Sequence, residues 1–431
     1  MRQMKIIGLA LGTCLALAAC GEVRYVSADG DDANDGLTEK TAWRTVPRLA
    51  KGLPAGGEGR LRRGDTYYCG RLFFRSGLDA EHRTKLTAWG EGPAPVLSAY
   101  MIPSNDPSVW KPAGEHLWSY VPTADKGLRG NTTVVNGNIG FLKIGDRIWA
   151  RKFFKVGQLA RQWDFYDDHT TLTVWSERNP AEMAKDIRLA PNTRVISFVN
   201  HLEVRGIDVR GTGGHGASGS GCDLRFIDCG FHEIGGSHLA GHGAGVSRYG
   251  NGIECWANSK DVLVKGCRIS EVYDVAFTMQ GPSPKFSWEN IHVVDCTISN
   301  CTQAIEIWIK RSAPGIGFRN CSFERNFCVN TSRSWGYETR PDKAGGTPLL
   351  LYSMETDTCD LLIKDNRFVN SQGALICFWR GLGTLPAGYR IVDNVIEGAA
   401  DAPICCQPGK DPAAFAAREK QIRAENKFVV R

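Results

Sequence analysis

From about residue 200 onward, short apolar segments recur along the chain. Each is followed by a Cys or an Asn and then by another apolar residue, as in 223–231, 261–269, 290–298, 315–323, 360–368 and 389–397. Aligning these segments places at one position, 25 to 45 residues apart, Cys229, Cys267, Cys296, Cys321, Asn366 and Asn394. The shortest interval suits one turn of a parallel β-helix, and the longer intervals indicate loops inserted into turns.

A second family of apolar strands interleaves with the first, at 252–257, 275–281, 304–310, 348–354, 374–380 and 403–408. A coil of two or three short strands cannot bury its apolar face alone. Stacked coils, with strands about 4.7–4.9 Å apart, bury a continuous core. We therefore predict an all-β solenoid in which the Asn side chains hydrogen-bond along their own column.

The amino terminus predicts export. Arg2 and Lys5 precede an apolar run, residues 6–19, that has the length of a signal peptide and is too short to span a bilayer. The run ends in Leu-Ala-Ala followed by Cys20 and Gly21, which resembles a bacterial lipoprotein cleavage box. That resemblance implies lipidation of Cys20 and anchoring to the outer membrane, on its periplasmic or cell-surface side. The alternative is a plain secretory signal.

Fifteen cysteines in an exported chain suggest disulfides at first sight. The repeated position instead favours a ladder of reduced cysteines that pack as small buried apolar groups. Disulfides and a metal site remain the alternatives. The sequence contains no CxxC pair, and the adjacent Cys405 and Cys406 suit neither chelation nor bridging, so we predict no metal site there.

The chain before residue 200 is organised differently. Residues 43–53 predict a short capping helix, and residues 141–153 and 163–177 alternate like antiparallel hairpins within a stretch that breaks the coil pattern. The tail has helical propensity and predicts a cap on the open end of the solenoid. The predicted divisions are a leader (1–19), a cap with the first coils (20–99), an inserted β-rich subdomain (100–195), the main coil (196–410) and a terminal cap (411–431).

The opening residues 25–36 run Tyr-Val-Ser and then through an acidic, Gly-containing loop. This motif and the coil pattern resemble the right-handed parallel β-helix, or pectin-lyase-like, superfamily. The resemblance implies that fold over nearly the whole mature chain. Its members are mostly glycoside hydrolases and polysaccharide lyases, with some epimerases and binding proteins, so function has to be argued from the site.

Residue types that carry sugar chemistry concentrate between residues 213 and 310. Strand alternation turns Glu254 and Trp256 to one face, opposite Ile253 and Cys255, and repeats this arrangement with Glu306 and Trp308. A carboxylate beside an indole on an exposed outer face suits a sugar, because apolar sugar faces stack on aromatic rings while the acid acts on the glycosidic oxygen.

Aligning the strands places Glu254, Phe277 and Glu306 in one column, with Asp274 just before the middle strand. We favour Glu254 and Asp274 as the catalytic pair, with Glu306 as the third candidate. Glu254 and Glu306 would stand two coils apart, about 9.6 Å, which suits inversion. Asp274 is one coil from either Glu, about 5 Å, which suits retention, so the stereochemistry stays open.

Further residues are candidates for substrate contact because they lie in Gly-rich loops or beside the acidic strands. They are His215, His242, Arg248, Tyr249, Trp256, Gln280, Trp308 and Lys310, together with Arg340 in the long loop 331–347. For each of them a purely structural role, in a turn or in packing, is the alternative.

Two other functions remain open. A polysaccharide lyase would use Lys310 or Arg340 as base or neutralising group, with Ca²⁺ as a possible cofactor. A glycan-binding or surface-structural protein would need no catalysis. A net charge of +6 without a Lys/Arg-rich run argues against nucleic-acid binding. We therefore expect a polysaccharide or oligosaccharide as partner and no cofactor for a hydrolase.

Overall fold

The computed structural model describes residues 21–133, 137–242, 247–340, 346–372, 374–378, 385–397, 404 and 412–429. The expected leader, Cys20 and all of the expected strand 403–408 except residue 404 lie outside this part. Among the helices described, none is long and apolar enough to cross a membrane.

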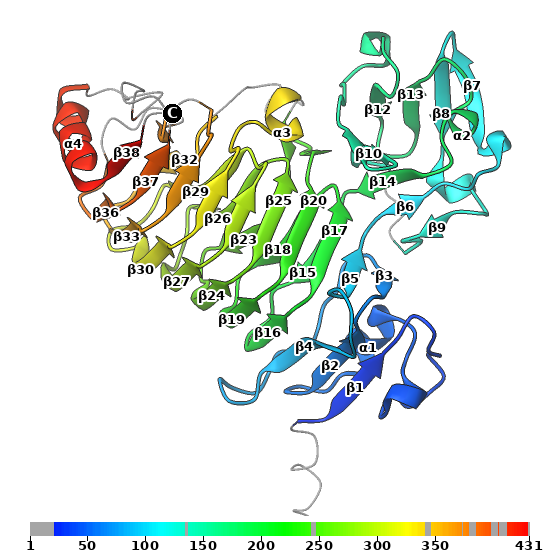
Figure 1. Cartoon of the computed structure of the whole chain (residues 1–431), viewed down its shortest axis with the longest axis horizontal. Helices are drawn as coiled ribbons and strands as arrows, with labels where there is room; N and C mark the ends of the chain where they lie inside the picture. The colour runs from blue at the N-terminus through cyan, green and yellow to red at the C-terminus, as the bar shows by residue number, and fades with distance from the viewer. Residues whose placement is uncertain are drawn as a thin grey trace, which may run out of the picture.

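Three parallel sheets wind around one axis (Figure 1). The first contains β1 (Val23–Val26), β2 (Glu58–Arg62), β4 (Thr84–Trp89), β16 (Leu202–Arg205), β19 (Cys222–Ile227), β24 (Lys260–Lys265), β27 (Trp288–Val294), β30 (Phe318–Glu324), β33 (Cys359–Lys364) and β36 (Tyr389–Val392). The second contains β3 (Thr66–Tyr68), β5 (Val96–Ser98), β17 (Asp208–Thr212), β20 (Gly230–Ile234), β25 (Arg268–Val272), β28 (Thr297–Ser299), β31 (Phe327–Val329), β34 (Arg367–Val369), β37 (Val395–Glu397) and β38 (Lys427–Val429). The third contains β15 (Arg194–Ser197), β18 (His215–Gly219), β23 (Ile253–Trp256), β26 (Val275–Pro282), β29 (Gln303–Lys310), β32 (Leu349–Met354) and β35 (Ile376–Phe378).

Between β15 and β35 the coils contribute strands to all three sheets, whereas the first coils, β1 to β5, contribute to the first two sheets only. The predicted all-β parallel solenoid is confirmed. Each ladder segment of the sequence, which the pattern treated as one strand, is divided by a turn between the first and the second sheet. Residues in the left-handed region make this turn, among them Asp228, Asp295, Asp365 and Asp393, with φ between 54° and 58°. Asp and Asn tolerate this region better than most residues, which explains why they recur at the corners.

The predicted ladder exists with one member exchanged. Asn366 Oδ1 accepts from the backbone N–H of Asn326 at 2.9 Å, and Asn394 Oδ1 accepts from that of Asn366 at 2.9 Å. Asn326 Oδ1 in turn accepts from the backbone N–H of Cys296 at 2.9 Å. Asn326, and not Cys321, is thus the rung between Cys296 and Asn366. Cys321 lies inside β30, where it pairs with Leu361 of β33.

The cysteines of the described residues are free thiols, and most are fully buried. Burial in apolar surroundings raises the pKa of Cys69, Cys321 and Cys359 to about 12, because it disfavours the thiolate. The expected reduced interior ladder is present at Cys229, Cys267 and Cys296, whose Sγ atoms face backbone carbonyls.

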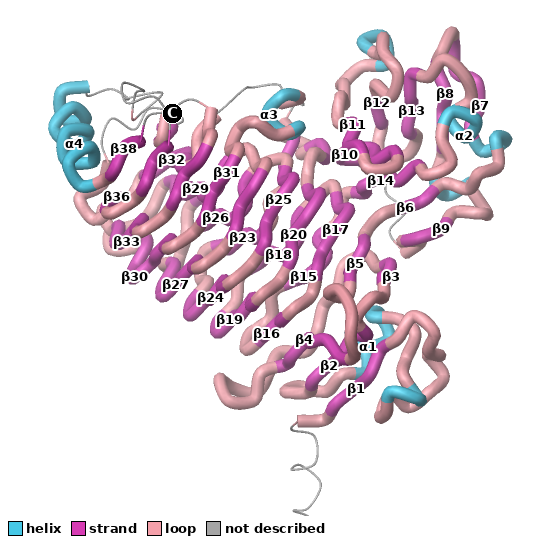
Figure 2. Tube along the Cα trace, in the orientation of Figure 1, coloured by secondary structure: helices cyan, strands magenta, loops and turns pink. Residues whose placement is uncertain are grey.

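An antiparallel subdomain interrupts the coils between β5 and β15 and stands beside them in Figure 2. One of its sheets runs β11 (Arg147–Trp149), β10 (Ile139–Ile144), β14 (Ile187–Pro191), β6 (Met101–Ile102) and β9 (Arg129–Gly130). The other runs β12 (Phe165–Asp167), β13 (Leu172–Trp175), β8 (Leu117–Tyr120) and β7 (Trp110–Gly114). Both predicted hairpins are present, as β10–β11 and β12–β13.

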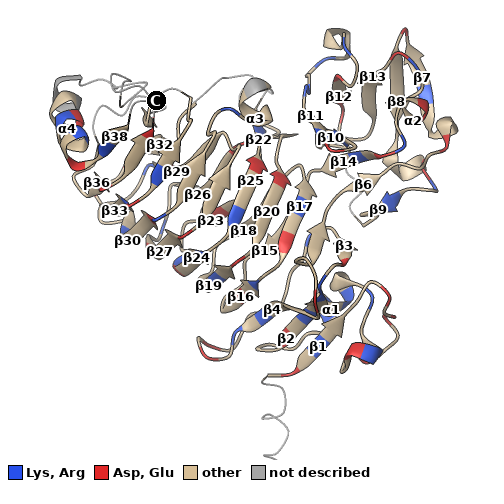
Figure 3. Ribbon diagram, in the orientation of Figure 1, with Lys and Arg blue, Asp and Glu red and all other residues tan. Residues whose placement is uncertain are grey.

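Helices are few. Helix α1 (Val46–Gly52) lies at the first coils, and α4 (Pro412–Glu425) covers the far end, where the sequence predicted caps (Figure 1). Helices α2 (Pro180–Met183) and α3 (Trp335–Glu338) are single turns. Most of the ribbon along the stacked strands carries no charge in Figure 3, as a buried solenoid core requires.

The ladder generates a stability prediction. Replacing Asn366 by Ala removes the acceptor of Asn326 and leaves the carbonyl of Phe323 and Oδ1 of Asn394 without the Asn366 amide donor. Unpaired buried polar groups each cost about 1–3 kcal/mol, so we expect a loss of at least about 2 kcal/mol. Urea unfolding followed by circular dichroism measures it. The control Cys267→Ala removes only weak S–H donors and should lose less; an equal or larger loss in the control would contradict the ladder's importance.

Candidate active site

Both predicted glutamates lie in one column of the third sheet. The register pairs Ser218 of β18 with Glu254, Glu254 with Thr278 of β26, and Thr278 with Glu306 of β29. We call Glu254, Thr278 and Glu306 the acidic column. The middle position is therefore Thr278, and not Phe277 as predicted. Phe277 belongs to the inner face and is fully buried in the core, together with Ile253 and Ile305.

The acidic column points away from the core but is not exposed, contrary to the prediction. Glu254 is 1% and Glu306 7% exposed. Segments that return over this face account for the burial: Tyr249 packs on His215 beside Glu254, and Arg340 reaches Asp274. A strand pattern reports which face a residue occupies, and it does not report what later covers that face.

Polar partners hold Glu254 on both sides. Nε2 of His215 lies 3.0 Å from Oε2 of Glu254, and the Gln280 amide donates to Oε1. Nδ1 of His215 accepts from the backbone N–H of Asn251, so the ring proton sits on Nε2, facing the carboxylate. Burial alone would raise the pKa of Glu254, but the attraction of the nearby His215 ring and the hydrogen bond from Gln280 outweigh it, and the pKa is lowered.

The environment of Glu306 has the opposite effect. Burial, and then repulsion from Asp274, raise the pKa of Glu306 to about 8, although Arg340 and Thr278 oppose the shift. Its nearest polar contact in the column is the Thr278 hydroxyl, 3.5 Å from Oε2. Glu306 is therefore protonated at neutral pH, whereas Glu254 is ionised.

Asp274 joins the site at the start of β26 and is held by a cation. Nη1 of Arg340 donates to Oδ1 of Asp274 at 2.6 Å, and the Arg340 guanidinium lies 5.6 Å from the centre of the Tyr273 ring. The sequence offered Arg340 as a substrate contact and, for a lyase, as a base or neutralising group. Here it partners one of the predicted catalytic acids.

A second outward column lies beside the acidic one. Trp256 pairs with Gln280, and Gln280 pairs with Trp308. Both tryptophans are half-buried, and Trp308 meets Tyr352 edge to face at 5.8 Å between ring centroids. The predicted pairing of an acid with an indole two residues on is therefore present on both strands.

The remaining predicted contacts divide between the site and its surroundings. Tyr249, on the short hairpin of β21 (Ser237–His238) and β22 (Arg248–Tyr249), lies beside His215 and donates to Asn192 at 2.6 Å. Arg248 does not reach the acidic column: it is buried and donates to the carbonyls of Gly236 and Gly140. It joins the subdomain to the coils.

His242 lies on an exposed turn of that hairpin, and Lys310 ends β29 opposite Pro282. For neither side chain does the described structure record a contact with the acidic column. Sequence reasoning missed Thr278 and Asn251. The sequence alignment was one residue out of register, so it placed Phe277 and not Thr278 between the two glutamates. Asn251 carried no signal beyond its place before the strand.

Among the described residues, no group of three or more His, Cys, Asp or Glu side chains is placed to hold an ion. In the acidic opening loop, Asp32 accepts from the backbone N–H groups of Arg44 and Thr45, just before α1. That carboxylate caps a turn.

The protonation of Glu306 predicts a pH effect on stability. Between pH 4.5, the ordinary value, and about 8, the unfolded chain loses this proton while the folded chain keeps it. Folding therefore loses stability as pH rises through this window, and the loss levels off above it. We expect Glu306→Gln to unfold with a flatter pH dependence, which denaturant titrations at pH 5, 6, 7 and 8 measure. A slope equal to that of the unchanged protein would contradict the raised pKa.

Comparison with known proteins bears on the fold. Residues 195–344 match the family model described as right handed beta helix region. No curated protein matches the chain.

Three solved structures are similar at low identity. XylC in complex with xylose is 9% identical with a TM-score of 0.45, covering 95% of this chain and 82% of its own. The GH136 lacto-N-biosidase from Eubacterium ramulus is 14% identical with a TM-score of 0.47, covering 95% and 68%. The alginate lyase from Paenibacillus is 9% identical with a TM-score of 0.37, covering 83% and 93%. The family match and the three parallel sheets together identify the main coil as a right-handed parallel β-helix, the fold of the superfamily that the sequence resembles.

Proposed function

We propose that this protein is a glycoside hydrolase in which Glu306 is the general acid and Glu254 the general base. One feature carries the proposal: two carboxyl groups in one outward column lie in surroundings that shift their pKa values in opposite directions. Environments that push the pKa values of two neighbouring acids apart are the means by which glycosidases obtain an acid and a base at one pH.

The proposed reaction adds one proton to the leaving oxygen and removes one proton from the attacking water. Protonated Glu306 gives its proton to the glycosidic oxygen, and the bond from that oxygen to the anomeric carbon breaks. Ionised Glu254 takes a proton from the water that attacks the same carbon from the opposite face. The products are the two shortened sugars. Glu254 then releases its proton to solvent and Glu306 takes one up from solvent, which restores the starting protonation states.

The spacing favours inversion. Glu254 and Glu306 are separated by one intervening strand, so their backbones stand about 9.6 Å apart at two strand spacings. Inverting enzymes need carboxyl groups about 6.5–9.5 Å apart, to admit a water. The intervening residue is Thr278, whose side chain is small and does not separate the two glutamates with bulk.

The surrounding residues suit the roles of Glu306 as acid and Glu254 as base. His215 and Gln280 keep the base ionised and oriented. Asp274 is held by Arg340 and raises the pKa of the acid, so we assign it a positioning role and transfer the second catalytic role to Glu306. Trp256 and Trp308 offer indole faces beside the acids, which suits sugar rings.

A lyase is less well supported by these contacts. Arg340 is tied to Asp274, and a guanidinium keeps its proton in proteins, so it suits neutralisation better than proton abstraction. A lyase would abstract a proton next to a uronate carboxyl group, and the product measured in the activity test distinguishes this reaction from hydrolysis. A glycan-binding protein without catalysis would not need acids of opposite protonation.

Removal of either acid tests the assignment. We expect Glu254→Gln and Glu306→Gln each to lower kcat/KM at least ~10²-fold, because each removes general acid or base help. The assay measures reducing ends released from neutral and uronate-containing polysaccharides. Glu289→Gln, a partly exposed acid of β27 paired with Lys260, is the control and should keep full activity. Full activity in either site variant would overturn the assignment.

The pH profile and the product give independent readouts. Activity should fall as pH rises through about 8, where Glu306 loses its proton, and fall again in acid where Glu254 gains one. Proton NMR of the first product should show the inverted anomer. A product that absorbs near 235 nm would identify a lyase, and a retained anomer would return Asp274 to the reacting pair.

A further inference from the structure

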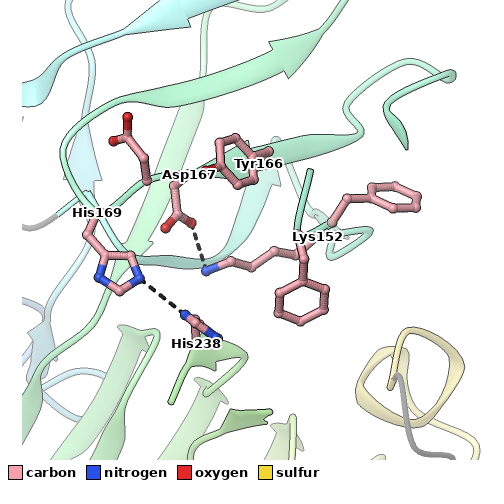
Figure 4. Close-up of a pocket in the computed structure, with 8 residues that line it drawn as sticks. Lys152, Tyr166, Asp167, His169 and His238 are labelled. Carbon is pink, nitrogen blue, oxygen red and sulfur yellow. Dashed lines mark hydrogen bonds and ion pairs between the residues drawn. The ribbon is translucent and has the colours of Figure 1, made fainter. Parts of the chain in front are cut away.

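A separate hollow of about 260 Å³ opens where the inserted subdomain meets the coils (Figure 4). Its walls come from the segment after β11, from the β12–β13 hairpin and from β21. The lining residues are Lys152, Phe153, Phe154, Tyr166, Asp167, Asp168, His169 and His238. We call it the junction hollow. Its volume lies just below the about 300–1,000 Å³ of ordinary ligand pockets, which suits a single ring.

One wall of the junction hollow contains the buried ion pair between Lys152 and Asp167. Nζ of Lys152 lies 2.7 Å from Oδ2 of Asp167 and also donates to Oδ1 of Asn138 and the carbonyl of Ile139. Burial lowers the pKa of Lys152 to about 8, and Asp167 opposes that shift. All three donors of the ammonium are used, so Lys152 shapes the wall and has none left for an anion.

The same pair leaves one acceptor unused. The Asp167 side chain is fully buried, and its Oδ1 atom has no hydrogen-bond partner. A buried carboxylate oxygen without a donor is rare and requires an explanation. In Figure 4, Asp167 lies between Lys152 and His169, so its carboxylate adds negative charge to the lining of the hollow.

The rest of the lining combines imidazole and carboxylate groups with aromatic rings. Nε2 of His169 lies 3.3 Å from Nδ1 of His238, and the two rings point toward one another (Figure 4). Asp168 accepts from the backbone N–H groups of Thr170 and Thr171, which lower its pKa and keep it ionised. Phe154 packs edge to face on His238, with ring centroids 5.5 Å apart.

The residue types in this lining indicate which class of ligand the hollow can bind. Aromatic faces suit the apolar side of a pyranose, and imidazole and carboxylate groups suit its hydroxyls. Two carboxylates face one ammonium in the hollow, and that ammonium is fully used, so a uronate would meet repulsion. An uncharged ring that donates hydroxyl protons fits better.

The hollow is connected to the acidic column by the β21–β22 hairpin. His238 pairs with Arg248, and the next residue, Tyr249, packs on His215, which holds Glu254. A glycan bound at both places would run along this hairpin.

We propose that the junction hollow is a second glycan-binding site, which takes one uncharged pyranose unit of the chain that the acidic column acts on. The claim that the hollow binds the same glycan as the acidic column rests on the proposed function. The claim that the hollow binds a sugar is independent of the proposed function.

Binding is tested on the full protein without turnover. Saturation-transfer NMR with xylose, glucose, N-acetylglucosamine, glucuronate and galacturonate should show binding of at least one uncharged sugar and weaker binding of both uronates. Hydroxyl-radical footprinting with the bound sugar should protect Tyr166 and Phe154. Tighter binding of the uronates, or protection at Trp256 and Trp308 alone, would overturn the proposal.

Two variants localise the site. Phe154→Ala removes a half-buried ring, and His169→Asn removes an imidazole at φ 73°, a conformation that Asn tolerates. Each should weaken sugar binding at least about tenfold, the size of one lost aromatic or hydrogen-bonding contact. The controls are Phe73→Ala, at an exposed ring, and His116→Asn, at φ 56° elsewhere in the subdomain, and both should bind as the unchanged protein does. Unchanged binding in both hollow variants would overturn the site.

Activity separates the two proposals. The hollow variants should keep the kcat of the unchanged protein on a disaccharide, which is too short to span the hairpin, and show a raised KM on long chains. If no hydrolysis occurs with any glycan, the proposed function fails while the binding measurements still decide the hollow. If hydrolysis occurs and both hollow variants keep the KM of the unchanged protein on long chains, the hollow as part of the substrate path is wrong.

Discussion

The constraint on which the rest of this structure depends is the parallel register of the third sheet. Backbone hydrogen bonds between neighbouring coils place equivalent residues directly above one another, and the side-chain ladder of Asn326, Asn366 and Asn394 fixes the same register at the corners. Because of that register, Glu254 and Glu306, which are 52 positions apart in the sequence, share one column. A slip of one residue would turn both glutamates into the apolar core.

The register brings the acids together, but electrostatics distinguishes them. Both glutamates are nearly inaccessible, and burial alone would neutralise each. His215 and Gln280 compensate for burial at Glu254. At Glu306 the repulsion of Asp274 adds to burial, and the opposing effects of Arg340 and the Thr278 hydroxyl do not offset them. The proposed chemistry therefore depends on residues around the acids at least as much as on the acids themselves. The residues that supply these effects come from β18, β26 and the segment that carries Arg340, which no local pattern connects.

The inserted subdomain changes what the coil can do. Arg248, buried and bonded to carbonyls on both sides of the junction, fastens it to the solenoid. At that junction a hollow forms from three segments, the one after β11, the β12–β13 hairpin and β21, and none of them would make a site alone. A regular solenoid offers only a flat face, so insertions of this kind give the scaffold its concave surfaces.

The sequence by itself determined the parallel coil, the helical caps, the antiparallel insertion and the outward orientation of Glu254, Glu306, Trp256 and Trp308, because strand periodicity and repeats are local signals. It misplaced Cys321 and Phe277, each through an alignment in which several registers bury the same apolar residues equally well. Only the tertiary structure decided that Asn326 and Thr278 occupy those positions, that the acids are covered, and that Arg340 meets Asp274. Burial, protonation and long-range pairing depend on what the rest of the chain packs above a residue, and that information is spread over loops whose conformations no repeat encodes.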